Sequence, residues 1–344
     1  MCGYSKHCRV VRQCSDYRSD PAAFIATLAE VSAEFAPAVL YPLEDVTLEL
    51  CLANPDAWMP NCRALLPSMN AFNAARDKWQ AVCLARELGI PTPRTVLVES
   101  PGAIEQLARE WQGPAVVKPR RGSGSRGVRF VENPSDLADA CQATGEAFGP
   151  IMVQERIPAD GAGLGVSVLM DSDSRPMATF GHQRLREYPT TGGPSCFCMS
   201  RRDDDLSARS IELLQRMRFV GVAMVEYKED VRSGRPIFME VNPRFWGSIG
   251  LAIASGVDFP LLYHQLALGL DTPRVDEYEL DVRYRWLLGD LLHFMASLKR
   301  GRCQWGCLRL FGRTIHNDIT LEDPWPFYGM IREALFRIVS GEGR

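Results

Sequence analysis

Two glutamates on neighbouring predicted strands are the residues whose spacing points most directly to chemistry. Glu226 lies in the segment Val222–Lys228 and Glu240 in Ile237–Asn242, and a short turn joins the segments. If the strands pair through that turn, the two glutamates are directly opposite each other, and Asn242 shares their face because side chains alternate along a strand. Two carboxylates and an amide oxygen are ligands that suit Mg²⁺. We therefore predict a metal site at Glu226, Glu240 and Asn242.

The alternative for this hairpin is a solvated pair of strands whose charges are dispersed among lysines. Opposed like charges destabilise a sheet unless a cation offsets them, and both glutamates stand among apolar residues, which favours the metal site. Arg244 follows Asn242 by two residues and shares its face if the strand continues, although Pro243 is expected to end the ladder. Arg244 is therefore a candidate catalytic residue beside the metal.

A glycine-rich run, GSGSRG, follows a short apolar strand. It contains Gly122, Ser123, Gly124 and Gly127 and fits G-x-G-x-x-G. A dinucleotide-binding loop opens a helix, whereas the residues after Gly127 are strand-like, and the chain has no G-x-x-x-x-G-K-[ST] loop. Strand, glycine loop and strand instead predict a hairpin flap whose backbone amides cradle phosphate oxygens. The alternative is a flexible surface hairpin.

Lysines and arginines gather near this predicted flap. Lys118 closes the apolar strand four residues before Gly122, a poor place for a solvent-facing lysine and a good one to meet a nucleotide phosphate. Lys78, on a predicted helix, is a second candidate, with an ordinary exposed helix lysine as the alternative. Three arginines are expected to add positive charge at the lip of the flap: Arg120, Arg121 and Arg126.

The predicted elements that must position these residues form an α/β protein. A helix begins at Pro21 behind the cap residue Asp20, and another runs from about Asn73 to Leu88. Strands and helices then alternate to about residue 270. The tail is helix-rich, with candidate helices at Trp286–Leu298 and Pro324–Arg337.

The composition is that of an ordinary globular protein of two or three domains: 344 residues, 46% hydrophobic, 24% charged, net charge −3. No basic excess indicates nucleic acid, and no polybasic block or long apolar run indicates a membrane. The first residues lack the apolar segment of a secretory signal. The eleven cysteines include no C-x-x-C pair and are expected to be reduced packing residues in a cytoplasmic protein.

Taken together, these motifs resemble the ATP-grasp superfamily, and most of all its carboxylate–amine ligase branch, which is related to the ATP-binding domains of carbamoyl-phosphate synthase and biotin carboxylase. The resemblance is carried by Lys118, the glycine run, Val153–Pro158, Glu226 and Met239–Trp246. It covers about residues 73–270 and implies the α+β ATP-grasp fold.

The implied domains are a small N-terminal pre-ATP-grasp α/β domain at 1–92, a two-lobed ATP-grasp domain at 93–270 and a helix-rich C-terminal extension at 271–344. The flap lobe spans about 93–155 and the metal and substrate lobe about 156–270. The first domain lacks the opening strand and glycine turn that are usual in relatives, so it is expected to be shortened or incomplete.

The resemblance also implies how ATP is bound. Lys78 and Lys118 would contact the α- and β-phosphates, and the Gly122–Gly127 loop would close over the β- and γ-phosphates. The hinge that receives the adenine edge and the ribose ligand would be formed by Gln154, Glu155, Ile157 and Asp160. Arg156 stands where this hinge commonly has an aromatic residue.

On the other side of the nucleotide, Glu226, Glu240 and Asn242 match the metal-binding positions for Mg²⁺, with Mn²⁺ as a substitute. Arg244 matches the residue that steadies the transferring phosphoryl group.

The acceptor substrate is expected at the segment Gly181–Ser195, which is interpreted as a glycine-rich loop between strands and which reaches the acceptor site in relatives. Arg184 and Arg186 in this segment fit an anionic substrate, with arginines on an exposed loop as the alternative. Gly192, Gly193 and Ser195 of the same segment are also predicted to contact the acceptor substrate. His182 is interpreted as a loop or core histidine rather than a base.

These observations predict an ATP-dependent carboxylate–amine ligase that forms an acyl phosphate and releases ADP and phosphate. Its partners would be a small-molecule carboxylate and an amine, such as amino acids. Two alternatives remain: an ATP-dependent carboxylase of the same fold, although the chain shows no biotin-carrier segment, and a non-catalytic ATP-binding protein.

Overall fold

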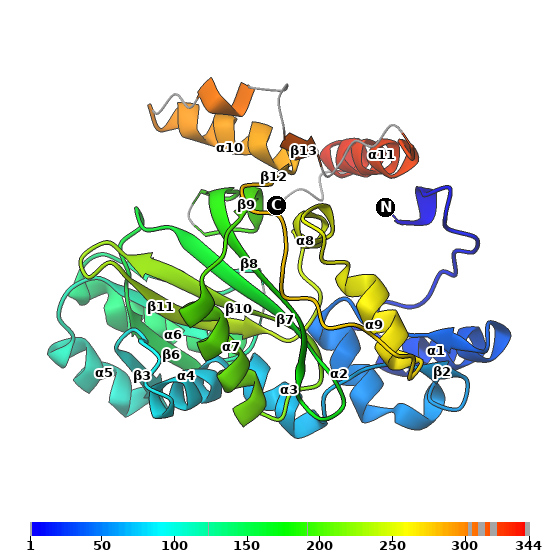
Figure 1. Cartoon of the computed structure of the whole chain (residues 1–344). Coiled ribbons are helices and arrows are strands. Elements are labelled where there is room, and N and C mark those ends of the chain that lie inside the picture. Colours follow the sequence, from blue (N-terminus) through cyan, green and yellow to red (C-terminus); the bar gives the residue numbers. More distant parts are fainter. Residues whose placement is uncertain are drawn as a thin grey trace.

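The structure is a computed structural model that describes residues 2–122, 124–190, 192–301, 305–308, 314–316 and 322–340. Within these residues the strands form a two-stranded, a four-stranded and a seven-stranded sheet. Figure 1 shows the four-stranded sheet on one side of the large sheet, the first two α-helices (Pro21–Glu34 and Asp45–Ala53) on the other and the last helices above them.

The N-terminal part combines short helices with the two-stranded parallel sheet. Its elements are η1 (Cys2–Tyr4), α1 (Pro21–Glu34), β1 (Ala38–Val39), α2 (Asp45–Ala53), η2 (Pro55–Ala57), β2 (Cys62–Arg63), α3 (Met69–Arg76) and α4 (Lys78–Glu87). The predicted start of α1 is confirmed, because the Asp20 carboxylate accepts a hydrogen bond from the Ala23 N–H at 3.0 Å and Pro21 is the first helical residue.

The single helix predicted from about residue 73 to residue 88 is wrong, because the chain forms two helices with a break at Asp77. Asp77 adopts an extended conformation and accepts hydrogen bonds from the N–H groups of Trp79 and Gln80, so it caps α4. The break places Lys78 at the first position of α4. The expected C-terminal glycine is confirmed, since Gly89 has φ +67°.

The four-stranded sheet carries the flap. Its strands β3 (Thr95–Val98), β4 (Ala115–Pro119), β5 (Arg129–Val131) and β6 (Ile151–Glu155) are antiparallel and stand in the order β3-β6-β4-β5. Helices α5 (Pro101–Glu110) and α6 (Leu137–Phe148), with η3 (Pro134–Asp136), complete this part. Val117, Leu137 and Val153 are fully buried in the core between sheet and helices. The glycine run connects β4 to β5, as predicted.

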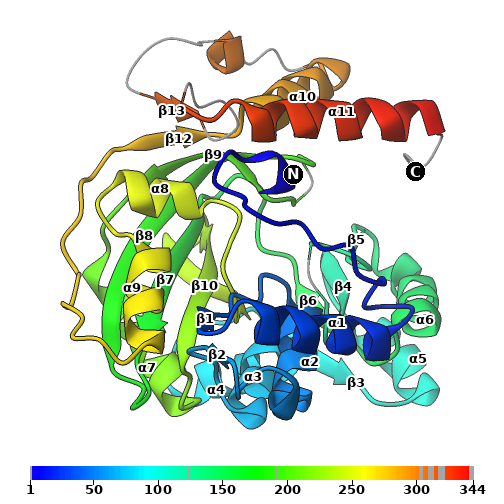
Figure 2. The ribbon, with the colours of Figure 1, turned by 90° about the vertical axis from the view of Figure 1, so that its right-hand side faces the viewer.

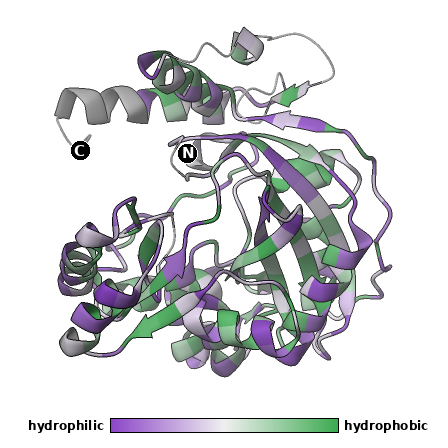
Figure 3. Cartoon of the chain, turned by 90° about the vertical axis from the view of Figure 1, so that its left-hand side faces the viewer, coloured by the Kyte–Doolittle hydropathy of each residue, from purple (hydrophilic) through white to green (hydrophobic). Residues whose placement is uncertain are grey.

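The large sheet has the strand order β11-β10-β7-β8-β9-β12-β13. Its strands are β7 (Gly163–Met170), β8 (Pro176–Glu187), β9 (Ser195–Ser200), β10 (Gly221–Asp230), β11 (Arg235–Asn242), β12 (Arg283–Arg285) and β13 (Thr314–His316). Hydrophobic residues are frequent along them (Figure 3). One face packs on α4 and on α7 (Asp204–Arg216). The other packs on α8 (Ile249–Ala254) and α9 (Phe259–Ala267).

The face of the large sheet that packs on α8 and α9 changes from apolar to charged along β10, and the candidate site lies at this change. Val222 and Met224 are buried under α8 and α9, whereas Glu226, the next residue on that face, is only partly buried. Charged side chains therefore begin where the helical cover ends.

The C-terminal tail contains two α-helices close to the predicted ranges, and it also contains strands. It supplies β12 and β13 to the large sheet as well as α10 (Leu287–Lys299), η4 (Trp305–Leu308) and α11 (Trp325–Ser340). Figure 2 shows α10 and α11 over the upper edge of the sheet, with the N-terminal segment beside α11. Ser5 bonds Asp323 at 2.5 Å and Arg332 bonds Tyr4 at 2.9 Å. Among the described residues, no helix has both the length and the apolar character to cross a bilayer.

Candidate active site

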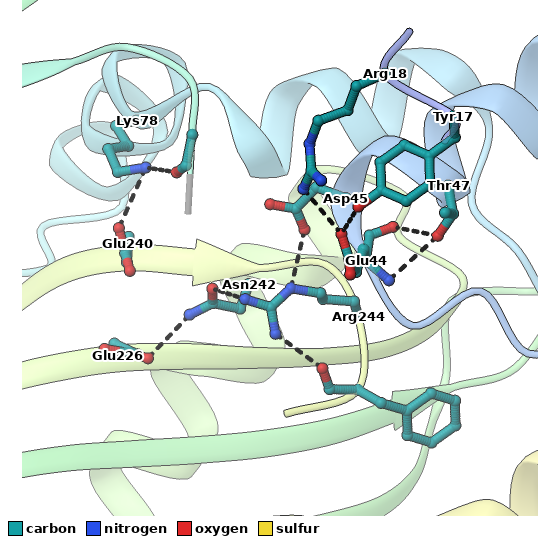
Figure 4. A network of polar contacts seen from close by, with 12 residues as sticks. Tyr17, Arg18, Glu44, Asp45, Thr47, Lys78, Glu226, Glu240, Asn242 and Arg244 are labelled. Carbon is teal, nitrogen blue, oxygen red and sulfur yellow. Dashed lines mark hydrogen bonds and ion pairs between the residues drawn. The ribbon is translucent and has the colours of Figure 1, made fainter. Parts of the chain in front are cut away.

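The predicted carboxylate pair is present on the β10–β11 hairpin. Glu226 and Glu240 are register partners, and Asn242 lies opposite Met224 on the same face. The Asn242 amide donates to Glu226 Oε1 at 2.9 Å. We call Glu226, Glu240 and Asn242 the carboxylate row (Figure 4). The predicted opposition of Glu226 and Glu240 is confirmed, but it depends on a register shift between Glu226 and Tyr227, because the pairing nearer the turn would otherwise place Met239 opposite Glu226.

Each carboxylate of the row already has a cation beside it. Arg184 Nη2 lies 2.5 Å from Glu226 Oε1, and Lys78 Nζ lies 3.3 Å from Glu240 Oε2. Both pairs are partly buried: the Glu226 and Glu240 side chains are 15% and 28% exposed. These cations offset the repulsion expected between opposed like charges.

The two carboxyl groups differ in pKa. Burial raises the pKa of Glu226, with Arg184 acting against it and the charge of Glu240 adding to it. Burial also acts to raise the pKa of Glu240, but the ammonium groups of Lys78 and Lys118 outweigh it, and this pKa lies below its ordinary value. Glu240 is therefore the more firmly ionised of the two and the stronger candidate to hold a divalent cation.

Lys118 faces this row from the small sheet. It is buried on β4, and burial lowers its pKa to about 8, although the charge of Glu240 raises it. A buried ammonium near two carboxylates fits the expectation that Lys118 meets an anion rather than solvent.

The flap is tied to Lys78. The Lys78 ammonium donates to the carbonyl oxygen of Gly122 at 2.6 Å, and its backbone N–H donates to Arg120 O at 2.9 Å. Gly122 and Gly124 have positive φ values of 129° and 67°, which residues with side chains rarely adopt. A Cβ on Gly127 would lie 2.8 Å from the Phe148 ring, so the base of the flap also requires glycine. Ser123 lies outside the described residues.

Of the three arginines beside the flap, Arg120 already has its charge paired with a carboxylate. Its guanidinium bonds both carboxylate oxygens of Asp77, at 3.2 and 2.6 Å. Asp77, which caps α4, therefore also fixes the strand that enters the flap.

The predicted hinge comprises the end of β6 and the residues that follow it. Gln154 is buried and its side chain donates to Thr95 Oγ1 at 3.0 Å. Glu155 pairs with Arg232 at 2.7 Å, and its N–H donates to Arg94 O at 2.8 Å. Ile157 is buried, and Asp160 is exposed in the following turn.

The segment Gly181–Ser195 is not a single loop, which corrects the sequence-based expectation. Arg184 and Arg186 both lie on β8, which extends to Glu187, and β9 begins at Ser195. Long β-branched runs mark strands in a sequence, but the end of β8 is polar, so only its pairing with β9 reveals it.

A β-bulge between Arg184 and Arg186 gives these arginines different environments. Arg184 bonds Glu226, whereas Arg186 bonds both carboxylate oxygens of Asp290 on α10, at 2.5 and 2.7 Å. The structure thus brings Arg184 to the carboxylate row and places Arg186 against the tail.

The connection between β8 and β9 reaches the flap. Ser125 Oγ donates to Gly192 O at 2.7 Å. Gly193 packs so closely that a Cβ would lie 2.3 Å from Tyr188 O, and the Ser195 hydroxyl donates to Phe197 O at 3.2 Å. Gly192 therefore links the β8–β9 connection to the glycine flap.

His182 fits the interpretation as a core histidine. It is 2% exposed on β8, and its ring occupies space that a Cβ on Gly165 would fill, at 2.2 Å from Cε1. Burial, reinforced by Arg184, lowers its pKa to about 3, so the ring is neutral.

One site residue was missed in the sequence. Asp45, the first residue of α2, accepts a hydrogen bond from Arg244 Nε at 3.1 Å (Figure 4). No signal in the sequence identifies it, because an acidic residue in the first turn of a helix is common for electrostatic reasons alone.

The donor set of the row fits a hard divalent cation. It offers two carboxylates and one amide oxygen, which leaves positions for phosphate oxygens and water. Nowhere in the described ranges do three His, Cys, Asp or Glu side chains cluster as a metal site, and the row itself has only two such side chains.

Comparison with known proteins identifies the family. Residues 75–248, about half of the chain, match the family model of the ATP-grasp domain. The chain therefore belongs to the ATP-grasp family, and the expected family and α+β ATP-grasp fold are confirmed.

Among curated proteins, the chain is similar to the mitochondrial acetyl-CoA carboxylase of Saccharomyces cerevisiae, with 26% identity over 241 residues. The match covers 66% of this chain and 10% of that protein. Acetyl-CoA carboxylase 1 of Oryza sativa is 28% identical over 136 residues, covering 38% of this chain and 6% of the relative. The chain thus spans a small part of these relatives.

Solved structures show the same fold. Biotin carboxylase of Campylobacter jejuni, described as a complex with β,γ-ATP, has a TM-score of 0.63 at 22% identity, covering 76% of this chain and 60% of that one. N5-carboxyaminoimidazole synthetase of Staphylococcus aureus has a TM-score of 0.58 at 14% identity, covering 75% and 66%.

Proposed function

We propose that the protein is an ADP-forming carboxylate–amine ligase that uses Mg²⁺ and ATP. The observation that carries this proposal is the carboxylate row: Glu226 and Glu240 are directly opposed, and each is paired with a cation from a different element, Arg184 and Lys78. Because the two carboxylates share one face and are only partly buried, they can hold a divalent cation together when ATP is bound.

In this proposal the chain holds ATP between its two larger sheets. Lys78 and Lys118 contact the α- and β-phosphates, and the flap covers the β- and γ-phosphates. The adenine and ribose lie at the hinge, at Gln154, Glu155, Ile157 and Asp160. Because the N–H of Glu155 already donates a hydrogen bond to Arg94 O, other backbone groups of the hinge would bind the adenine.

Glu226, Glu240 and Asn242 would hold Mg²⁺, or Mn²⁺ in its place. When bound, the cation neutralises phosphate charge and helps to orient the phosphate oxygens. Arg244 steadies the transferring phosphoryl group, and Arg184 binds the acceptor carboxylate beside Gly192, Gly193 and Ser195. Arg186, which is bound to Asp290, takes no part.

The reaction then has two steps. A carboxylate oxygen attacks the γ-phosphorus, the bond from that phosphorus to the β,γ-bridging oxygen breaks, and ADP leaves. The nitrogen of an amine next attacks the acyl carbon, phosphate leaves and the amine loses a proton. Positioning and electrostatic stabilisation supply the catalysis.

A second candidate is a carboxylase in which bicarbonate takes the place of the acceptor carboxylate. It is favoured by a structural neighbour, the biotin carboxylase domain of Hydrogenobacter thermophilus 2-oxoglutarate carboxylase, described in complex with MgADP and bicarbonate, with a TM-score of 0.64. That neighbour is 14% identical, so the likeness supports the fold rather than the substrate.

A screen of ADP and phosphate release from Mg·ATP tests both candidates. Release with pairs of amino acids and without bicarbonate supports the ligase, and release with bicarbonate alone supports the carboxylase. Glu240→Gln should lower release about 100-fold, whereas Glu229→Gln should not, because Glu229 lies on the paired strand β10 and on the face opposite to Glu226. Binding of Mg·ATP without release under any condition would leave the non-catalytic alternative.

A further inference from the structure

Arg244 is held by three acceptors. Its Nε donates to Asp45 Oδ1 at 3.1 Å, its Nη1 to the backbone oxygen of Phe245 at 2.9 Å and its Nη2 to Asn242 Oδ1 at 3.3 Å. Only the first of these acceptors carries a charge. Figure 4 shows the guanidinium between the carboxylate row and the start of α2.

The charged acceptor comes from the N-terminal part of the chain, and its position is firmly fixed. Asp45 is the first residue of α2, directly after Glu44, which forms a capping box with Thr47. Glu44 also accepts hydrogen bonds from Tyr17 and Arg18. These contacts support the first turn of α2, which brings the Asp45 carboxylate to Arg244.

Loss of the ion pair between Arg244 and Asp45 is expected to affect the carboxylate row. The side chains of Arg244 and Asp45 are 20% and 18% exposed, so water screens their attraction only partly. The charge of Arg244 also acts on Glu226. Without Asp45, the guanidinium would keep only neutral acceptors and would be drawn towards the carboxylates that must hold the metal.

We propose that Asp45 is a positioning residue, a carboxylate supplied by the N-terminal part of the chain that keeps Arg244 aimed at the transferring phosphoryl group and away from Glu226. This inference rests on the proposed function. It gives the N-terminal part a direct role in phosphoryl transfer that the family match, which begins at residue 75, does not include.

The test compares two complexes of the full chain by calorimetry: Mg·ADP alone, and Mg·ADP with aluminium fluoride, which mimics a phosphoryl group in transfer. Asp45→Asn should weaken the fluoride complex about tenfold, because a misplaced charged donor loses most of its effect, and should change Mg·ADP affinity less than about twofold. Asp45→Glu should restore part of the loss. Glu49→Gln is the matched control, since Glu49 also lies on α2 and pairs with Arg76 at 2.6 Å.

A double-mutant cycle adds a readout that a merely structural role would not move. If Asp45 acts through Arg244, Asp45→Asn should have no further effect in an Arg244→Met background. Equal weakening of both complexes, an unchanged fluoride complex or additive effects would overturn the inference. A wild-type chain that does not bind Mg·ADP, or does not bind it more tightly with fluoride, would instead overturn the proposed function and the inference with it.

Discussion

Strand β8 contributes to two ion networks, and they differ in burial and in how their charges are paired. In the carboxylate row, Glu226 and Glu240 remain partly exposed, and each contacts one cation. In the second network, which we call the tail anchor, Asp290 is fully buried and binds both Arg186 and Arg285. The row keeps oxygen atoms accessible, whereas the anchor encloses its carboxylate completely.

This difference in exposure indicates that the carboxylate row is a binding site and that the tail anchor has a structural role. The cations of the row, Lys78 and Arg184, are the same groups that would bind phosphate and acceptor, so their contacts with the carboxylates can be exchanged. The guanidinium groups of the anchor also pack over the Phe197 ring: the Cζ atoms of Arg186 and Arg285 lie 4.3 and 4.8 Å from the ring centroid. These contacts restrict the conformations of both side chains. We therefore expect changes in the row to affect activity and changes in the anchor to affect stability.

The largest effect is expected in the tail anchor. Asp290→Asn removes the charge that two buried guanidinium groups share, and breaking a buried ion pair from one side typically costs about 3–5 kcal/mol. Urea unfolding followed by circular dichroism measures the loss. Asp205→Asn is the control, because Asp205 pairs with Arg209 on the surface and should change stability by less than about 0.5 kcal/mol. Equal losses would remove the distinction between buried and surface pairs.

The next effect distinguishes the two arginines of β8. Arg184→Met should lower ADP release about 100-fold and cost less stability than Arg186→Met, because Glu226 is partly exposed and keeps the amide of Asn242, whereas Asp290 is fully buried. Arg186→Met should lower stability more and leave ADP release nearly unchanged. Steady-state rates and unfolding curves of both variants check this pattern. If both variants lost activity equally, Arg186 would belong to the site after all.

The smallest effect concerns pH. Burial lowers the pKa of Lys118 to about 8, so the ammonium that meets phosphate is lost as pH rises through 8. Affinity for Mg·ATP should therefore fall up to about tenfold between pH 7 and pH 9. Stability should move the other way: the unfolded chain binds the Lys118 proton up to about pH 10.5, so this residue's contribution to stability rises with pH between about 8 and 10.5.

Lys118→Arg provides the control for this titration, because a guanidinium stays charged throughout the range. Calorimetric titrations of Mg·ATP at several pH values should show a flat profile for the variant. Parallel profiles for variant and wild type would mean that another group titrates.

Much of the site could be predicted because it depends on local structure. Alternation along a strand places Glu240 and Asn242 on one face, and Asp20 caps its helix through a residue three positions away. The pairing of Glu226 with Glu240 also needs the register shift beside Glu226, which the length of the turn does not specify. The glycines of the flap follow equally from a local need for positive φ. The break at Asp77 was missed because the same residue both caps α4 and binds Arg120, 43 residues later.

The amino-acid sequence by itself determined the carboxylate hairpin, the glycine flap and the lysine before it, since neighbouring residues specify each of them. The tertiary structure alone decided that Arg184 turns to Glu226 while Arg186 turns to Asp290, and that Asp45 reaches Arg244, 199 residues away. Such contacts depend on a β-bulge and on how separate elements pack, and an ion pair between distant segments exists only after those elements have been brought together.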